Sequence, residues 1–253
     1  MKSTIAAALL LLTAVSAHAG SESQPSFEQP LAATDDFSFR FAVYGWIQSF
    51  DGDVTVAGGT ADLDLKFEDL FDYIDMAFMG AAEVSYGRWG LLVDLNYADV
   101  GARIPTPLGI VAPIASYSQE QWMVNMLASY QVMKTSSTLL GVHAGARLNH
   151  IGVDLRFNAR ELSGEQTWID PVIGLRFQQM LSPSFFLLAA GDIGGFDVSS
   201  DLTWQILAGI GWRFNECGSA FVGYRVVDTD YTQGNFEWDL NTHGPILGLE
   251  FTF

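Results

Sequence analysis

The chain has 253 residues, of which 29 are acidic and 12 basic, and a formal charge of −17. This charge argues against nucleic-acid binding, which needs a basic surface, and a single Cys excludes a disulfide framework and a cysteine-rich zinc site. Hydrophobic residues make up 49% of the chain, yet past the N-terminus no segment has the roughly 20 consecutive apolar residues that a membrane-spanning helix needs.

The first 19 residues have the pattern of an export signal. Lys2 precedes an apolar run from Ile5 to Val15 and the small-x-small sequence Ala17-His18-Ala19, which together are typical of a cleaved signal peptide. Residues 20–36 are rich in Ser, Glu, Gln and Pro and show little periodicity. We therefore expect a signal peptide over 1–19, a flexible periplasmic tail over 20–36 and a single domain over 37–253.

From residue 37 onward, apolar residues recur at every second position. Between 37 and 48 the odd positions hold Phe, Phe, Phe, Val, Gly and Ile, whereas the even positions mix polar, small and aromatic residues. Successive side chains of a strand point to opposite faces, so this alternation predicts a strand with one apolar face. The same alternation returns along the chain, first over 74–86, 89–97, 121–132 and 139–149 and then repeatedly toward the C-terminus.

The connections between these segments alternate between short and long. Short turns are expected at Gly87-Arg88, Lys134 to Ser137, Ser182-Pro183-Ser184 and Asn215 to Gly218. Mostly longer loops are expected at 49–73, 101–118, 155–166, 197–201 and 231–237. Nine connections imply ten strands, and an even number of strands with short turns at one end is typical of outer-membrane barrels.

The apolar faces distinguish a membrane barrel from a soluble one. In lipid only a helix or a closed sheet satisfies every backbone group, whereas a soluble lipocalin-like barrel would need a Lys-rich and Glu-rich outer face. This chain has only three Lys. Aromatic residues near the strand ends also fit two interfacial girdles, namely Trp89, Tyr97, Trp122, Tyr130, Trp168, Trp204, Trp212 and Phe214.

The expected fold is thus all-β, a closed antiparallel transmembrane β-barrel of about 10 strands. Counts of 8 or 12 remain open because residues 62–67 alternate between polar and apolar and would suit an extra short strand or hairpin. Residues 67–73 would equally suit a short turn of helix.

The last seven residues carry the sharpest motif. Leu247, Leu249, Phe251 and Phe253 alternate with other residues, and the chain ends in Phe. This ending resembles the terminal strand of bacterial outer-membrane β-barrel proteins. The resemblance implies that these four residues form the signal read by the barrel-assembly machinery, and that the protein lies in the outer membrane of a Gram-negative bacterium. Short motifs such as Gly223-Tyr224-Arg225 are similar to uncharacterised proteobacterial outer-membrane proteins, a group that implies no activity.

Charged residues also occupy the polar faces of the expected strands. They are Arg40, Asp75, Glu83, Asp94, Arg147, Asp170, Arg176, Asp192, Arg213, Arg225 and Glu250. Small barrels have interiors largely filled by side chains, so we interpret these residues as an ion-pair network in the lumen. The expected protein is a non-enzymatic structural or surface component, and the alternative is a narrow channel for ions or small polar solutes.

Two of the expected loops have unusual compositions. The first carries one base, Lys66, and the acidic residues Asp51, Asp53, Asp62, Asp64, Glu68, Asp69 and Asp72. Such carboxylates would suit a divalent cation such as calcium, but only a fragment of a calcium loop is present, so a solvated acidic loop is the favoured interpretation. The second, at 101–117, is apolar and rich in Pro, and we expect it either to plug the barrel mouth or to lie against the membrane.

Catalytic chemistry is the least favoured interpretation. A hydrolase at the rim needs a nucleophile, a His and an acid that converge, and no motif places a Ser beside His143, His150 or His243. Asp239 and His243 would have to serve as the Asp–His couple of a rim protease without its surrounding motifs. No nucleotide, flavin or haem motif appears, so no cofactor is expected.

Overall fold

A computed structural model describes residues 37–70, 74–102, 114–157 and 160–253. Nearly all of them lie in strands, and none of the described helices is long and apolar enough to cross a membrane. The elements are β1 (Phe37–Trp46), β2 (Ser49–Val56), β3 (Gly59–Leu65), α1 (Phe67–Leu70), β4 (Ile74–Tyr86), β5 (Trp89–Ala102), β6 (Ile114–Lys134), β7 (Thr138–Phe157), β8 (Arg160–Met180), β9 (Phe185–Gly195), β10 (Leu202–Arg213), β11 (Gly218–Gln233) and β12 (Phe236–Thr252). The expected signal peptide, the tail and residues 103–113 of the apolar loop lie outside the described residues.

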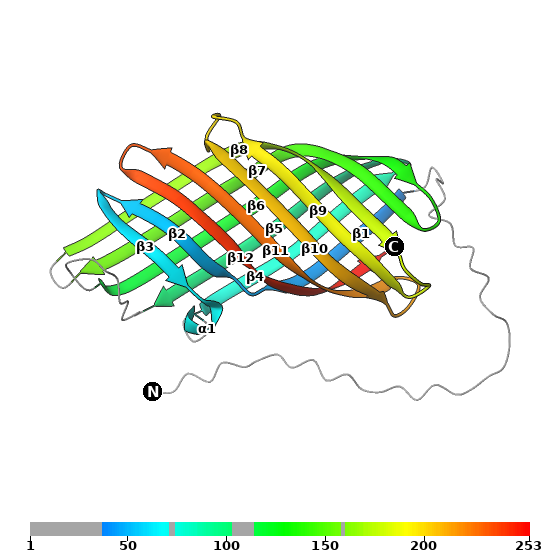
Figure 1. The fold of residues 1–253 in the computed structure, drawn as a ribbon, viewed down its shortest axis with the longest axis horizontal. Helices are drawn as coiled ribbons and strands as arrows, with labels where there is room; N and C mark the ends of the chain where they lie inside the picture. The colour runs from blue at the N-terminus through cyan, green and yellow to red at the C-terminus, as the bar shows by residue number, and fades with distance from the viewer. Residues whose placement is uncertain (1–36, 71–73, 103–113, 158–159) are drawn as a thin grey trace.

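Ten strands close into an antiparallel barrel, as predicted. They follow the order β1, β4, β5 and so on to β12, which pairs back onto β1 with Phe251 opposite Phe41. The short turns, the start of β1 and the end of β12 lie at one end of the barrel. We call it the turn end, and it is at the right in Figure 1. The backbones of Phe39 and Phe253 exchange hydrogen bonds of 2.9 and 2.8 Å there and complete the closure.

Strands β2 and β3 form a hairpin outside this ring, at the opposite, outer end of the barrel (Figure 1). The hairpin and α1 both lie within the expected first loop, 49–73. The hairpin corresponds to the extra hairpin that the sequence left open, and α1 corresponds to the short turn of helix. The part of β12 nearer the turn end pairs with β1, and the part nearer the outer end pairs with β2. Gly244 lies at this change of partner, and the position favours glycine because its φ is +156° and a Cβ there would collide with the carbonyl oxygen of Ile47.

Two of the expected loops are wrong, because the strands continue through them. β7 and β8 extend through 155–166 with only residues 158–159 between them, and β11 and β12 extend through 231–237 around a tight turn. The alternation persists there with its polarity exchanged: Tyr231, Phe236 and Trp238 point inward and are buried. The segments are hairpins with an apolar inner face at the outer end of the barrel.

Apolar side chains cover the outside of the barrel near the turn end. Leu91 is 68% exposed and Val222 is 59% exposed, and the outward residues of β1 are exposed Phe and Val. A contiguous exposed apolar surface of this kind on a closed sheet is the lipid-facing band of a transmembrane barrel.

Trp168 does not belong to the expected aromatic girdle. It has the same parity as Asp170, so it points inward, where it is 5% exposed and stacks on Tyr231 with ring centroids 4.0 Å apart. The interior at this height therefore contains a buried pair of stacked aromatic rings.

An apolar core fills the barrel at the outer end, and we call it the outer core. The β2–β3 hairpin contributes alternate apolar residues that point inward. The other residues of this core come from β5, β7, β8, β11 and β12. Its buried members are Phe50, Val54, Val56, Ala61, Leu63, Leu65, Val100, Ile151, Val153, Trp168, Tyr231, Phe236, Trp238 and Leu240. A void of about 10 Å³ beside this core has room for about one water at most.

Candidate functional site

The lumen below the outer core is polar, and Arg147 lies at its centre. Arg147 extends from β7 and is 0% exposed. Its Nε donates to Asn125 Oδ1 at 2.9 Å, its Nη1 to Thr203 Oγ1 at 2.9 Å and its Nη2 to Asp192 Oδ1 at 2.6 Å. One guanidinium therefore ties together strands β6, β7, β9 and β10 from the inside.

Arg225 of β11 forms the second half of this layer. Its Nη2 lies 3.2 Å from Asp94 Oδ2 and donates to Gln205 Oε1 at 2.8 Å. Its Nη1 donates to the hydroxyl of Tyr44 at 3.3 Å, and that hydroxyl donates in turn to Asp94. Gln205 also donates to Asp192, so both arginines belong to one connected set, which we call the central network.

A second charged cluster lies nearer the turn end. Glu83, which is 5% exposed, accepts from Arg40 and from Arg176 Nη1, the latter at 2.5 Å. Arg40 Nη1 also lies 3.3 Å from Glu250 Oε2. This cluster joins β1, β4, β8 and β12 across the lumen.

The structure therefore brings eight of the eleven expected charged residues into lumen ion pairs. Asp170 is fully buried but accepts instead from the backbone nitrogen and Oγ of Ser200 at 2.8 and 2.7 Å and from Trp168 Nε1 at 3.0 Å. Asp75 is exposed beside Gly101, and Arg213 is exposed at the end of β10, with Met180 Sδ 3.7 Å away. Asn125, Thr203 and Gln205 complete the contacts of the central network although they are uncharged and so were not among the expected charged residues; their parity places them on the same inward faces.

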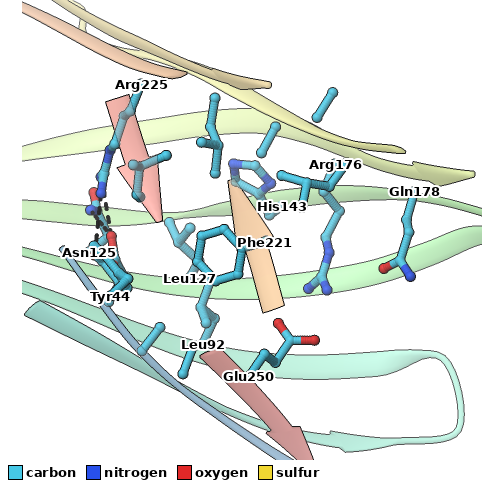
Figure 2. Close-up of a pocket in the computed structure, with 18 of the residues that line it drawn as sticks. Tyr44, Leu92, Asn125, Leu127, His143, Arg176, Gln178, Phe221, Arg225 and Glu250 are labelled. Atoms are coloured by element: carbon cyan, nitrogen blue, oxygen red, sulfur yellow. Dashed lines mark hydrogen bonds and ion pairs between the residues drawn. The ribbon is translucent and has the colours of Figure 1, made fainter. Parts of the chain in front are cut away.

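A cavity of about 210 Å³ separates the two charged layers, and we call it the lumen cavity. Figure 2 shows Arg225, Tyr44 and Asn125 at one end and Arg176, Gln178 and Glu250 at the other, with apolar side chains and His143 between them. His143 is 6% exposed, and its Nε2 lies 3.7 Å from Asp192 Oδ2.

Carboxylates face each other directly on the outer surface of β3, β2, β12 and β11. Asp53 is opposite both Asp62 and Asp239, and Asp239 is opposite Asp230. We call these four residues the acidic row. A second like pair, Asp51 opposite Asp64, lies beside it.

This row lies toward the outer end of the barrel, and the pKa values of two of its carboxyl groups are raised. Partial burial, together with Asp228, Asp53 and Glu237, raises the pKa of Asp239 above its ordinary value. Burial and the neighbouring Asp239 likewise raise the pKa of Asp230. Within the described ranges, no group of three or more His, Cys, Asp or Glu side chains is arranged to hold a metal ion, so the divalent cation stays a prediction from sequence. Asp72 lies outside the described residues.

Replacing Asp53 by Asn is expected to stabilise the outer hairpin by about 0.5–1 kcal/mol at neutral pH and low salt, because like charges directly opposite on a sheet repel. The raised pKa values mean that the folded protein binds more protons than the unfolded chain, so wild-type stability should rise as the pH falls from neutral toward the ordinary Asp pKa of about 3.9. Hydrogen exchange of the β2 amides, recorded at two salt concentrations and over this pH range, measures both effects.

Asp51→Glu, which keeps the charge, is the control for this substitution. The gain from Asp53→Asn should shrink in high salt, since screening weakens repulsion between exposed charges. Unchanged exchange in the Asn variant at low salt would contradict the repulsion.

The histidines near the rim do not pair with the acid that a rim protease would need. Asp239 and His243 are four residues apart on β12, which at about 3.3 Å per residue separates them by about 13 Å. His243 Nδ1 lies 2.7 Å from the hydroxyl of Tyr224, and His150 Nδ1 lies 2.7 Å from Thr167 Oγ1. The Asp239–His243 couple of a rim protease is therefore not formed.

No protein-family model matches the sequence, and no curated protein matches it. Among solved structures, the outer membrane protease OmpT of Escherichia coli is similar with a TM-score of 0.57 at 12% identity, over 90% of this chain and 100% of that chain. The transport unit of the autotransporter AIDA-I from Escherichia coli has a TM-score of 0.46 at 9% identity, over 91% and 93% of the two chains. Ail of Yersinia pestis has a TM-score of 0.38 at 12% identity, over 87% and 100%.

At 12% identity, the likeness to OmpT shows a shared fold and carries no activity with it. Together with the lipid-facing band and the closed ring of strands, it places this chain among bacterial outer-membrane β-barrels in fold.

Proposed function

We propose that this protein is a non-conducting barrel with a structural or surface role in the outer membrane of a Gram-negative bacterium. The observation that carries the proposal is the outer core, which fills the outer end of the barrel with buried apolar side chains. A conducting lumen needs a continuous path for water, and a packed apolar layer excludes water.

The central network supports the same proposal from within the membrane. Arg147 and the Asp192 side chain are both 0% exposed, so the centre of the lumen is packed on these ion-paired groups. The narrow channel, which is the alternative function, would require water to pass both this layer and the outer core. Buried and ion-paired charges fit a role in holding the wall together.

We also propose that the C-terminal strand is the assembly signal. Leu247, Leu249 and Phe253 are 53%, 42% and 72% exposed on the lipid side of β12, and Phe251 lies between them in the alternation. β12 is the strand that closes the ring on β1, so a machine that reads this face would engage the last strand before closure.

Conductance across a planar bilayer tests the proposal. The full chain, inserted into a lipid bilayer, is expected to give no current steps above the leak of the bare membrane, and a general porin inserted in the same way serves as the positive control. Resolved current steps that scale with the amount of inserted protein would overturn the proposal and favour the narrow channel.

A further inference from the structure

We propose that the lumen cavity is a binding site for a small monocarboxylate with a hydrocarbon body, which enters from the turn end. This inference goes beyond the proposed structural role and does not depend on it.

The cavity is larger than ordinary packing leaves. Protein interiors contain few voids larger than a water molecule, and an engineered apolar cavity of about 150 Å³ binds benzene. The lumen cavity measures about 210 Å³. It exists because three inward positions of β1, β4 and β9 hold alanines, namely Ala42, Ala81 and Ala190, where a longer side chain would have filled the space.

The middle of the cavity has apolar walls, although it lies between two charged layers. Leu92, Leu127 and Phe221 face it between the ends in Figure 2, and Leu188, Leu207 and Ile246 complete this wall. Water gains few hydrogen bonds against such a surface, so a hydrocarbon body suits it better.

The turn end of the cavity offers donors for an anionic head. Among the described residues, the side chain of Arg176 makes one hydrogen bond, from Nη1 to Glu83, while a guanidinium carries five N–H donors. Gln178 lies beside it at this end (Figure 2). The carboxylate of Glu250 is also present, but Arg40 already holds it at 3.3 Å. Arg176 therefore keeps N–H donors for a ligand carboxylate in addition to the one that it gives to Glu83.

The cavity is reached from the turn end and closed at the other. The side chains of Arg40 and Glu250 are each 25% exposed, and they belong to positions close to the strand ends. In the other direction, the central network and the outer core block the lumen. The site is a blind pocket with a polar mouth, an apolar middle and a polar floor whose charges are already paired.

Binding of octanoate to the full chain in lipid nanodiscs, measured by calorimetry against empty nanodiscs, tests the inference. Saturable binding of octanoate is expected, with octylamine at least about tenfold weaker because its cation meets the arginines. Ala81→Phe fills the cavity and should weaken octanoate binding about tenfold or more. Ala82→Phe, the same substitution on the lipid side of β4, should leave it unchanged.

Leu207→Trp on β10 is a second filling variant, with Ile206→Trp as its lipid-facing control, in case Ala81→Phe does not fold. Arg176→Gln should weaken octanoate but leave octanol binding unchanged, which separates the head-group contact from the apolar wall. No saturable binding beyond empty nanodiscs, equal binding of octylamine, or full binding by a folded filling variant would each overturn the inference.

Discussion

Replacing Arg147 by Met is expected to lower the free energy of unfolding by about 3–5 kcal/mol, because removal of one partner leaves a buried charge uncompensated. The side chains of Arg147 and Asp192 are both 0% exposed, and the lost guanidinium also leaves Asn125 and Thr203 without their donor. Guanidinium titration of the protein in lipid vesicles measures the change.

Two variants make this experiment specific. Arg213→Met removes an exposed arginine at the end of β10 and should change the unfolding free energy by less than about 0.5 kcal/mol. The double variant Arg147→Met with Asp192→Leu should recover part of the loss, since replacing a whole buried pair by apolar residues is often nearly neutral. A single variant as stable as wild type would contradict the structural role of the central network.

The sequence predicts that these charged residues point inward, but it does not predict which of them pair with each other. Arg40 pairs with Glu83, which is directly opposite it in the sheet register. Arg147 is directly opposite Asp170, yet it bonds to Asp192 on the next strand, because Ser200 and Trp168 already occupy Asp170. Curvature of the closed wall brings non-adjacent strands together, and alternation carries no information about that curvature.

The count of about ten strands followed from the number of connections, and the faces of the membrane-spanning segments followed from alternation, but the outer hairpins followed from neither. Along β12 the outward positions change from Leu249 and Leu247 to Asp239 and Glu237, while the inward positions change to Leu240 and Trp238. The period of two continues while the two faces exchange polarity, because the surroundings change from lipid to water. If one face is assumed to be apolar along the whole strand, the outer segments are assigned to loops, and Trp168 is placed on the lipid side although it points inward.

The lumen cavity was not foreseen for a related reason. Ala42, Ala81 and Ala190 are inconspicuous in a strand pattern, since Ala suits either face. Only the closed barrel shows that these three alanines line the same cavity and leave it unfilled.

Replacing Trp168 by Ala is expected to cost about 3–5 kcal/mol of unfolding free energy, as for other buried aromatic residues truncated in a core. The ring stacks on Tyr231 at 4.0 Å with an interplanar angle of 6°, and its Nε1 donates to the buried Asp170 at 3.0 Å. The substitution thus removes core volume and one bond to a buried carboxylate together. Guanidinium titration in vesicles gives the total loss, and hydrogen exchange of the β2 amides shows whether the outer hairpin opens first.

Trp168→Phe separates the two contributions, because it keeps an aromatic ring against Tyr231 and removes only the donor to Asp170; it should cost about 1–3 kcal/mol. Trp89→Ala is the control for loss of a Trp as such, since Trp89 is 64% exposed on the lipid side and supports no core. Equal destabilisation by Trp168→Ala and Trp89→Ala would mean that the outer core is not tightly packed. The argument that this core blocks the lumen to water would then fail.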